Sequence, residues 1–203
     1  MKDKINIFWF RRDLRLEDNT GLYHALRAGL PVLPIFMFDT EILDKLENRS
    51  DARVEFIHNA IIEIDTELKR YDSSLLTIAG KPADIWIKLT DEYEISEVFT
   101  NHDYEPYSTK RDAEVDSLLC SKEIKFNTFK DQVIFEKNEV VKPDGRPYSI
   151  YTPYSKTWRA KFSPKNIEEF PLKEPHINFY KIKSSILSLD EIGFKKTGLS
   201  FPS

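Results

Sequence analysis

Short apolar runs alternate with segments of helical character over the first 130 residues, and this alternation limits the chain to few folds. Residues 54–68 show the strongest helical period, with apolar side chains three and four positions apart. Strand–helix alternation implies parallel pairing with right-handed crossovers. The sequence therefore predicts an α/β fold, a Rossmann-like doubly wound parallel sheet of about five strands with helices on both faces. The expected strands lie at residues 5–10, 32–38, 75–79, 98–100 and 124–129.

Residue types at the ends of the expected helices indicate where each helix begins. Asp18 or Asn19 is expected to cap a helix at about residues 20–28. Ser50 is expected to cap the helix at 54–68, which would turn Val54, Ile57, Ile61, Ile64 and Leu68 toward the core. Further helices are expected from Pro82 and from about residue 108.

The character of the chain changes after residue 130, and we expect three segments. Residues 1–130 form the Rossmann-like α/β domain. Residues 131–162 complete it with a hairpin or tight turn around residues 143–147 and a short helix that carries Trp158 and Phe162. Residues 163–203 are interrupted by prolines and are expected to form an extended connector that packs on the domain or leads to another.

Composition excludes several classes of protein. A net charge of −4 gives no overall basic bias, so the chain is not expected to bind nucleic acid by itself. No apolar run could span a membrane, and the residues after Met1 lead into a strand instead of a signal peptide. The single cysteine, Cys120, fits a reducing cytoplasm and is expected to be a buried structural thiol on a helix. Histidine spacing indicates no metal site, and dinucleotide, P-loop, CxxC and HExxH motifs are absent from the sequence.

An arginine-rich turn follows the first expected strand, at the sheet edge where open α/β folds bind ligands. Arg11, Arg12 and Arg15 surround Asp13 there. Three guanidinium groups with one carboxylate could hold a phosphate or carboxylate of a ligand. They could equally form a salt-bridged turn that ties the loop to the rest of the protein.

Two further polar stretches end strands at the same edge. Asp39 closes the second strand, where an acid can accept hydrogen bonds from ribose hydroxyls or simply cap the short helix after it. Residues 101–107 bring acids, a histidine and two tyrosines together after the fourth strand, with Arg111 following. Aromatic faces, carboxylates and an arginine suit a planar ring system, whereas the alternative is a solvated loop before a capped helix.

Several blocks of the sequence, in order, resemble the DNA photolyase and cryptochrome family. The first reads Trp-Phe-Arg-Arg-Asp-Leu-Arg-Leu-Glu-Asp-Asn and spans residues 9–19. The others span residues 34–43, 101–115, 145–158 and 188–194. The resemblance covers essentially the whole chain, but only the amino-terminal part of the family's proteins.

The resemblance implies the light-harvesting chromophore domain of a deoxyribodipyrimidine photolyase, a carbon–carbon lyase and flavoprotein that repairs pyrimidine dimers in DNA. The catalytic FAD would lie only in a carboxy-terminal helical domain that these 203 residues do not include, so this part alone is expected to be catalytically inactive. The implied partners are that FAD domain and, through the full-length protein, damaged DNA. Alternatives are the same domain of a cryptochrome photoreceptor, a Rossmann-like nucleotide-binding module, and an interaction domain without a chromophore.

The resemblance also implies an antenna chromophore, of FMN or deazaflavin type in preference to a folate. Folate-type members carry an Asn-Glu pair where this chain has Tyr107 and Ser108. Members that bury a flavin-type antenna are more similar to this chain in the strand end at Phe36 and Asp39 and in the stretch from Asp103 to Tyr107. By that analogy the residues expected around the ring system are Phe10, Arg11, Phe36, Asp39, Asp103, Glu105 and Arg111.

Overall fold

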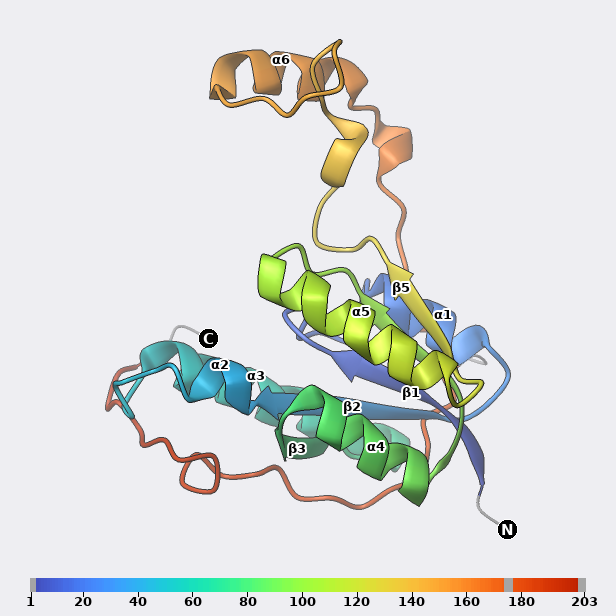
Figure 1. Ribbon diagram of the computed structural model, residues 1–203. Coiled ribbons are helices and arrows are strands. Elements are labelled where there is room, and N and C mark those ends of the chain that lie inside the picture. The colour runs from blue at the N-terminus through green and yellow to red at the C-terminus, as the bar shows by residue number, and fades with distance from the viewer. Residues whose placement is uncertain (1–2, 174–176, 201–203) are drawn as a thin grey trace.

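The computed structural model describes residues 3–173 and 177–200, and its centre is a five-stranded parallel sheet in the order β3-β2-β1-β4-β5 (Figure 1). This confirms the predicted α/β fold with a doubly wound sheet. The chain builds one half outward from β1 to β3 and then crosses back to place β4 on the other side of β1. The strands are β1 (Lys4–Phe10), β2 (Val32–Asp39), β3 (Leu76–Gly80), β4 (Glu94–Asn101) and β5 (Lys125–Phe129).

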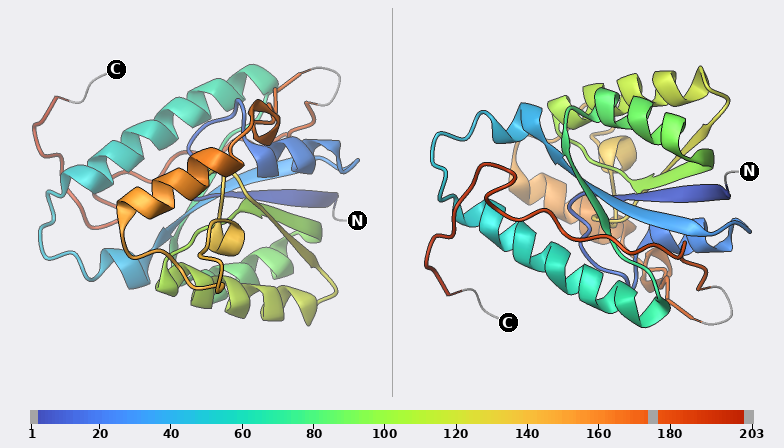
Figure 2. Two further views of the ribbon diagram at one scale, coloured as in Figure 1. Left: turned by 90° about the horizontal axis from the view of Figure 1, so that it is seen from above. Right: turned by 90° about the horizontal axis from the view of Figure 1, so that it is seen from below.

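Helices cover both faces of the sheet because its strands are apolar on both sides. Every residue of β2 is buried, which accounts for its nearly continuous apolar sequence. Helices α1 (Thr20–Arg27) and α3 (Ala52–Leu68) pack on one face, and α4 (Pro82–Glu92) and α5 (Pro106–Cys120) on the other (Figure 2). The two faces form separate hydrophobic clusters, one around Phe8 and the other around Trp86.

Several local predictions need correction. Asp51, not Ser50, caps α3, because the Asp51 carboxylate accepts a hydrogen bond from the Arg53 amide. The α5 helix begins at Pro106, two residues before the expected start at about residue 108, since proline suits the first helical position. Cys120 is exposed at the last residue of α5 and is not a buried thiol.

The part of the chain between β5 and the last segment forms a projection that stands away from the sheet (Figure 1). It contains the 3-10 helices η2 (Lys137–Glu139) and η3 (Pro164–Asn166) and the helix α6 (Tyr151–Lys161). The region around residues 143–147 is a tight turn without paired strands, closed by a hydrogen bond from the Lys142 amide to the Arg146 carbonyl. None of the α6 residues is buried.

The described residues after Asn166 run back along the sheet and α3 without regular helices or strands (Figure 2). Phe179 forms a bridge beside Val32, at the start of β2. Leu189, Ile192 and Phe194 are buried in the same hydrophobic cluster as α1 and α3. This segment therefore contributes to the core of the α/β body.

Candidate functional site

A cavity of about 460 Å³ lies at the carboxyl ends of β1 and β2. The short helix α2 (Thr40–Leu43), the start of α3 and the first turns of α5 form its sides. The edge beside the reversal of strand order is where open α/β sheets bind ligands, and the volume lies within the range of small-molecule sites. All seven residues expected around a ring system line this cavity: Phe10, Arg11, Phe36, Asp39, Asp103, Glu105 and Arg111.

The apolar lining includes residues that sequence reasoning did not assign to a site. Trp9 and Met37 come from the strands, Leu43 and Leu46 from α2 and the loop after it, and Ile57 from α3. Ile57 was expected in the core, but 36% of it is exposed because it faces the cavity. The helical period of α3 does not separate a core position from a cavity position, since both favour apolar side chains.

Two guanidinium groups lie against the ring of Trp9. The Cζ of Arg11 is 4.2 Å and that of Arg111 is 4.9 Å from the ring centroid. Asp112 pairs with both, through Oδ2 at 2.6 Å from Arg11 Nη1 and Oδ1 at 3.1 Å from Arg111 Nη2. The shared carboxylate offsets the repulsion between two buried cations.

Arg11 has unused hydrogen-bonding capacity inside the site. Its Nη1 donates to Asp112 and to the Asn101 carbonyl, but its buried Nε and Nη2 have no hydrogen-bond partner among the described residues. Burial lowers the pKa of Arg11, since a desolvated guanidinium favours its neutral form. Leaving such donors unpaired is costly, and a ligand oxygen could reach them only if side chains of the cavity wall moved, since both atoms have almost no accessible surface.

The acids of the second polar stretch are held by a third arginine. Arg12 Nη2 lies 2.5 Å from Glu105 Oε1, and Arg12 Nε lies 3.7 Å from Asp103 Oδ1. Asp103 also accepts a hydrogen bond from the hydroxyl of Ser108. The arginine-rich turn is therefore salt-bridged to the stretch after β4, which is the second of the two interpretations, and it lies at the rim of the cavity.

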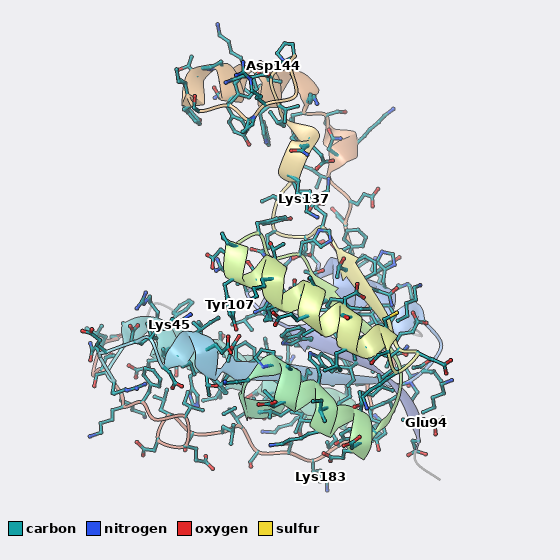
Figure 3. All side chains as sticks on the ribbon, viewed as in Figure 1. Lys45, Glu94, Tyr107, Lys137, Asp144 and Lys183 are labelled. Carbon is teal, nitrogen blue, oxygen red and sulfur yellow. The ribbon has the colours of Figure 1, made fainter. Side chains whose placement is uncertain are left out.

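Asp39 accepts two hydrogen bonds from the protein. Its Oδ1 caps α2 through the Glu41 amide, and its Oδ2 lies 2.5 Å from the Tyr107 hydroxyl. Burial and the bond to Asp39 raise the pKa of Tyr107 above its ordinary value. Lys45 lies over the Tyr107 ring at 5.3 Å, and Figure 3 labels both residues at the same end of the sheet.

A buried polar network holds the arginine-rich turn in place. The Asp13 carboxylate accepts hydrogen bonds from the amide of Arg11 and from the side chains of Asn19 and Asn101. Burial raises the pKa of Asp13. Asp13 does not line the cavity, so its role there is to fix the backbone that presents Arg11 and Arg12.

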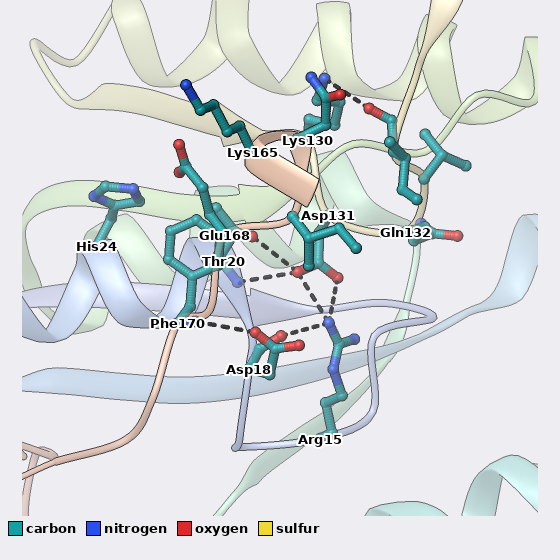
Figure 4. Close-up of a pocket in the computed structure, with 14 residues that line it drawn as sticks. Arg15, Asp18, Thr20, His24, Lys130, Asp131, Gln132, Lys165, Glu168 and Phe170 are labelled. Atoms are coloured by element: carbon teal, nitrogen blue, oxygen red, sulfur yellow. Dashed lines mark hydrogen bonds and ion pairs between the residues drawn. The ribbon is translucent and has the colours of Figure 1, made fainter. Parts of the chain in front are cut away.

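A second cavity, of about 530 Å³, lies between the start of α1 and the base of the projection (Figure 4). Its polar groups largely pair with one another. Asp131 accepts from Arg15 and from the Thr20 backbone and hydroxyl, and Asp18 accepts from the Phe170 amide. None of the seven predicted residues lines it.

Within the described ranges, no cluster of three or more histidine, cysteine or acidic side chains has the arrangement of a metal site. None of the helices described there has the length and apolar character needed to cross a membrane.

Comparison with known proteins identifies the family. The sequence model of the DNA photolyase family matches residues 6–175. The deoxyribodipyrimidine photo-lyase of Synechococcus sp. is 32% identical over 158 residues, which are 78% of this chain and 32% of that protein. Cryptochrome-1 of Arabidopsis thaliana is 31% identical over 175 residues, or 84% of this chain and 24% of that protein.

The archaeal photolyase of Sulfolobus tokodaii, whose crystal structure holds two FAD molecules, matches with a TM-score of 0.72 and 26% identity. That match covers 93% of this chain and 40% of the archaeal chain. The chain spans about a third of the length of the deoxyribodipyrimidine photo-lyases of Synechococcus and Alkalihalophilus. The family match, the sheet order and the structural likeness agree, and the chain therefore belongs to the DNA photolyase family, as the amino-terminal α/β domain found in its photolyases and cryptochromes.

Proposed function

We propose that the cavity at the ends of β1 and β2 binds a planar light-harvesting chromophore. The observation that carries this proposal is the lining of the cavity, in which aromatic, carboxylate and guanidinium side chains meet at the ends of parallel strands. The guanidinium groups of Arg11 and Arg111 suit a carbonyl or phosphate oxygen of a ligand.

The residues fit a flavin-type ring system. Phe10 and Phe36 line the cavity together with Trp9, which gives aromatic surface for a planar ring. Asp103 and Glu105 offer acceptors for ring N–H groups, and Arg111 offers a second cation. When bound, the chromophore would absorb light and pass excitation energy on, while the protein only positions it.

We propose FMN or a deazaflavin in preference to a folate. Where folate-type relatives are expected to carry Asn-Glu, Tyr107 is bonded to Asp39 and Ser108 to Asp103, so both side chains are already used inside the protein. The archaeal relative with two FAD molecules supports a flavin in this family's light-harvesting role.

For the whole protein we propose a deoxyribodipyrimidine photolyase that acts in the cytoplasm. Its carboxy-terminal domain would hold the catalytic FAD and receive the excitation energy, and damaged DNA would be the substrate. A cryptochrome photoreceptor is the second candidate, favoured by the 31% identity to Cryptochrome-1 of Arabidopsis thaliana. Light-dependent repair of dimer-containing DNA by the full-length protein would support the photolyase and exclude a signalling-only role.

The first experiment is a fluorescence-quenching titration of the chain with FMN, a deazaflavin and a reduced folate. We expect saturable binding of one of the first two and none of the folate. The variants Phe36→Ala, Asp103→Ala and Arg11→Met should each weaken that binding at least tenfold, a loss of about 1.4 kcal/mol. Arg15→Met is the matched control, because Arg15 lines the second cavity and not this one.

The possible outcomes distinguish a chromophore site elsewhere in the protein from the absence of any chromophore site. Binding that survives all three substitutions in folded protein would place the chromophore elsewhere. No binding of any of the three compounds by the wild-type chain would favour an interaction domain that keeps the fold without an antenna.

A further inference from the structure

Trp9 is the one tryptophan that lines the chromophore cavity, and only 2% of it is exposed. Indole is among the most easily oxidised side-chain groups, and it gives up an electron readily to an excited ring system held against it. Such a transfer would end the excited state before its energy could be passed on. A cavity that positions a light-absorbing ligand therefore has to keep Trp9 from losing an electron.

Two positive charges cover the ring of Trp9. The Cζ of Arg11 lies 4.2 Å and that of Arg111 lies 4.9 Å from the ring centroid, and both side chains are buried, so water and salt screen them little. Arginine keeps its charge in proteins even where burial lowers its pKa. A cation over neutral indole is attracted to the ring, whereas the same cation repels an indole that has lost an electron.

Neighbouring carboxylates hold these cations in place. Asp112 pairs with both arginines, and Asp103 Oδ2 lies 3.9 Å from Arg111 Nη2. The carboxylates offset part of the positive charge, but the groups that lie over the ring are the two guanidinium groups.

A second indole lies behind the first. The ring of Trp86, which is fully buried, stands edge-on to the ring of Trp9 at 5.6 Å between centroids. An oxidised Trp9 could take an electron from Trp86, and the electron lost to the chromophore would then have no quick way back. The first transfer, from Trp9, is therefore the step that has to be prevented.

We propose that Arg11 and Arg111 protect an excited chromophore from quenching by Trp9, an inference that rests on the proposed chromophore function of the cavity. The step that they disfavour moves one electron from the indole ring of Trp9 to the excited chromophore. Trp9 is oxidised and the chromophore is reduced by one electron, and return of that electron releases the excitation as heat. Coulomb repulsion from two cations over the ring makes the first transfer less favourable.

The first test is the fluorescence lifetime of FMN bound to an excess of the chain. Arg111→Gln removes one charge and should shorten the lifetime about threefold or more, because Trp9 then loses an electron more easily. Arg111→Lys keeps a cation and should retain most of the wild-type lifetime. In the double variant Trp9→Phe, Arg111→Gln the lifetime should return to at least the wild-type value, since the electron donor is gone.

Arg53→Gln is the matched control for the loss of a cation from the cavity. Arg53 lines the same cavity, but its side chain is 74% exposed and pairs with Asp51 at 2.6 Å. FMN bound to this variant should keep the wild-type lifetime. The circular-dichroism spectrum should be the same in all of these proteins.

A second test needs no chromophore. The chain alone is mixed with ruthenium(III) tris-bipyridine, a one-electron oxidant, and mass spectrometry follows the oxidation of each tryptophan. Because Trp9 is almost fully buried, the oxidant acts on it by electron transfer and not by contact. Trp9 should be oxidised about threefold faster or more in Arg111→Gln than in the wild type or Arg111→Lys. Oxidation of Trp158 on α6 should be equal in all three.

The proposal is overturned by a bound-FMN lifetime that Arg111→Gln leaves unchanged, or that the added Trp9→Phe does not restore. Equal rates of Trp9 oxidation in Arg111→Gln and the wild type would also overturn it. Absence of FMN binding would instead count against the chromophore function. The oxidation rates of the chain alone would then still decide whether the arginines make Trp9 harder to oxidise, so the two failures are distinguishable.

Discussion

Gly21 allows α1 to lie directly against β4. A Cβ at this position would be 2.8 Å from Asn101 Oδ1 and 2.9 Å from the ring of Phe8. The same Asn101 oxygen accepts a hydrogen bond from the Gly21 amide, and the Asn101 amide group donates to Asp13. Because Gly21 has no side chain, α1 can approach closely enough for the hydrogen-bond network that fixes the arginine-rich turn to form.

Replacing Gly21 with alanine should lower the free energy of unfolding by about 1–3 kcal/mol, because the added methyl group overfills a packed contact. Urea denaturation would measure the change. Asn59→Ala, on the exposed face of α3, is the control and should be nearly neutral. An unchanged midpoint for Gly21→Ala would show that α1 can shift without cost.

At the scale of residues, the sequence predicted which side chains lie at one edge of the sheet but not which hydrogen bonds and ion pairs they form. The order of strands brings the ends of β1, β2 and β4 together, so Arg11, Asp39 and Asp103 could be placed at one edge in advance. Their pairings depend on side-chain geometry, which spacing does not encode. For that reason the buried sharing of Asp112 by two arginines was not foreseen.

At the scale of elements, the start of α1 is tied to the base of the projection by Asp131. Its carboxylate accepts hydrogen bonds from the Thr20 amide and hydroxyl and from Arg15, and only 1% of its side chain is exposed. A residue 111 positions away therefore accepts the hydrogen bond of the Thr20 amide, a donor at the helix start that has no partner within the helix.

Asp131→Ala should destabilise the protein by about 1–3 kcal/mol, since it leaves the Thr20 amide without its acceptor. Thermal unfolding followed by circular dichroism would show this as a lower midpoint. Asp131→Asn keeps an acceptor oxygen and should recover part of the loss. Equal midpoints for the alanine and asparagine variants would contradict this role.

The last described segment is held on α3 by a carboxylate. The Thr197 hydroxyl and amide donate to Glu55, which lowers the pKa of Glu55 below its ordinary value of 4.5. A lowered pKa means that this contribution to stability is complete above pH 4.5 and is lost as pH falls through the folded-state pKa.

Glu55→Gln should therefore destabilise the protein at pH 7, and its penalty should disappear as the solution is acidified and the wild-type carboxylate becomes protonated. Urea unfolding at a series of pH values would test this. Glu63→Gln, exposed on the same helix, is the control. A penalty that did not change with pH would show that charge on Glu55 is irrelevant.

Elements with strong periodicity were predicted well, and elements defined by distant contacts were not. All five strands were expected, and β1 and β2 nearly with their bounds, because strands buried on both faces are continuous apolar runs. Only residues 98–100 of β4 were expected, since polar residues interrupt its first half. Of the two forms expected around residues 143–147, hairpin or tight turn, the chain takes the tight turn, and no strand flanks it in the described part of the chain. The Val32–Phe179 bridge joins residues far apart in sequence, and no local sequence pattern predicts it.

At the scale of the whole molecule, the chain should position a chromophore but not repair DNA. It spans about a third of the length of the photolyases it matches. We expect no light-dependent splitting of pyrimidine dimers when the chain is illuminated with reduced FAD and dimer-containing DNA. Recovery of base absorbance near 260 nm is the measurement, with a full-length photolyase as positive control, and any recovery with the chain alone would contradict the prediction.

Residues 137–166, in the projection, carry a net charge of +5 and the rest of the chain −9, and this separation bears on how these molecules meet one another. Each molecule is a large electric dipole, so at low ionic strength the projection of one should be attracted to the α/β body of the next, head to tail. A chain with a sequence pI near 5.7 would therefore be held by cation-exchange as well as anion-exchange resin. Self-association, measured as light scattering, should be least in moderate salt, where a Debye length of about 8 Å screens the attraction.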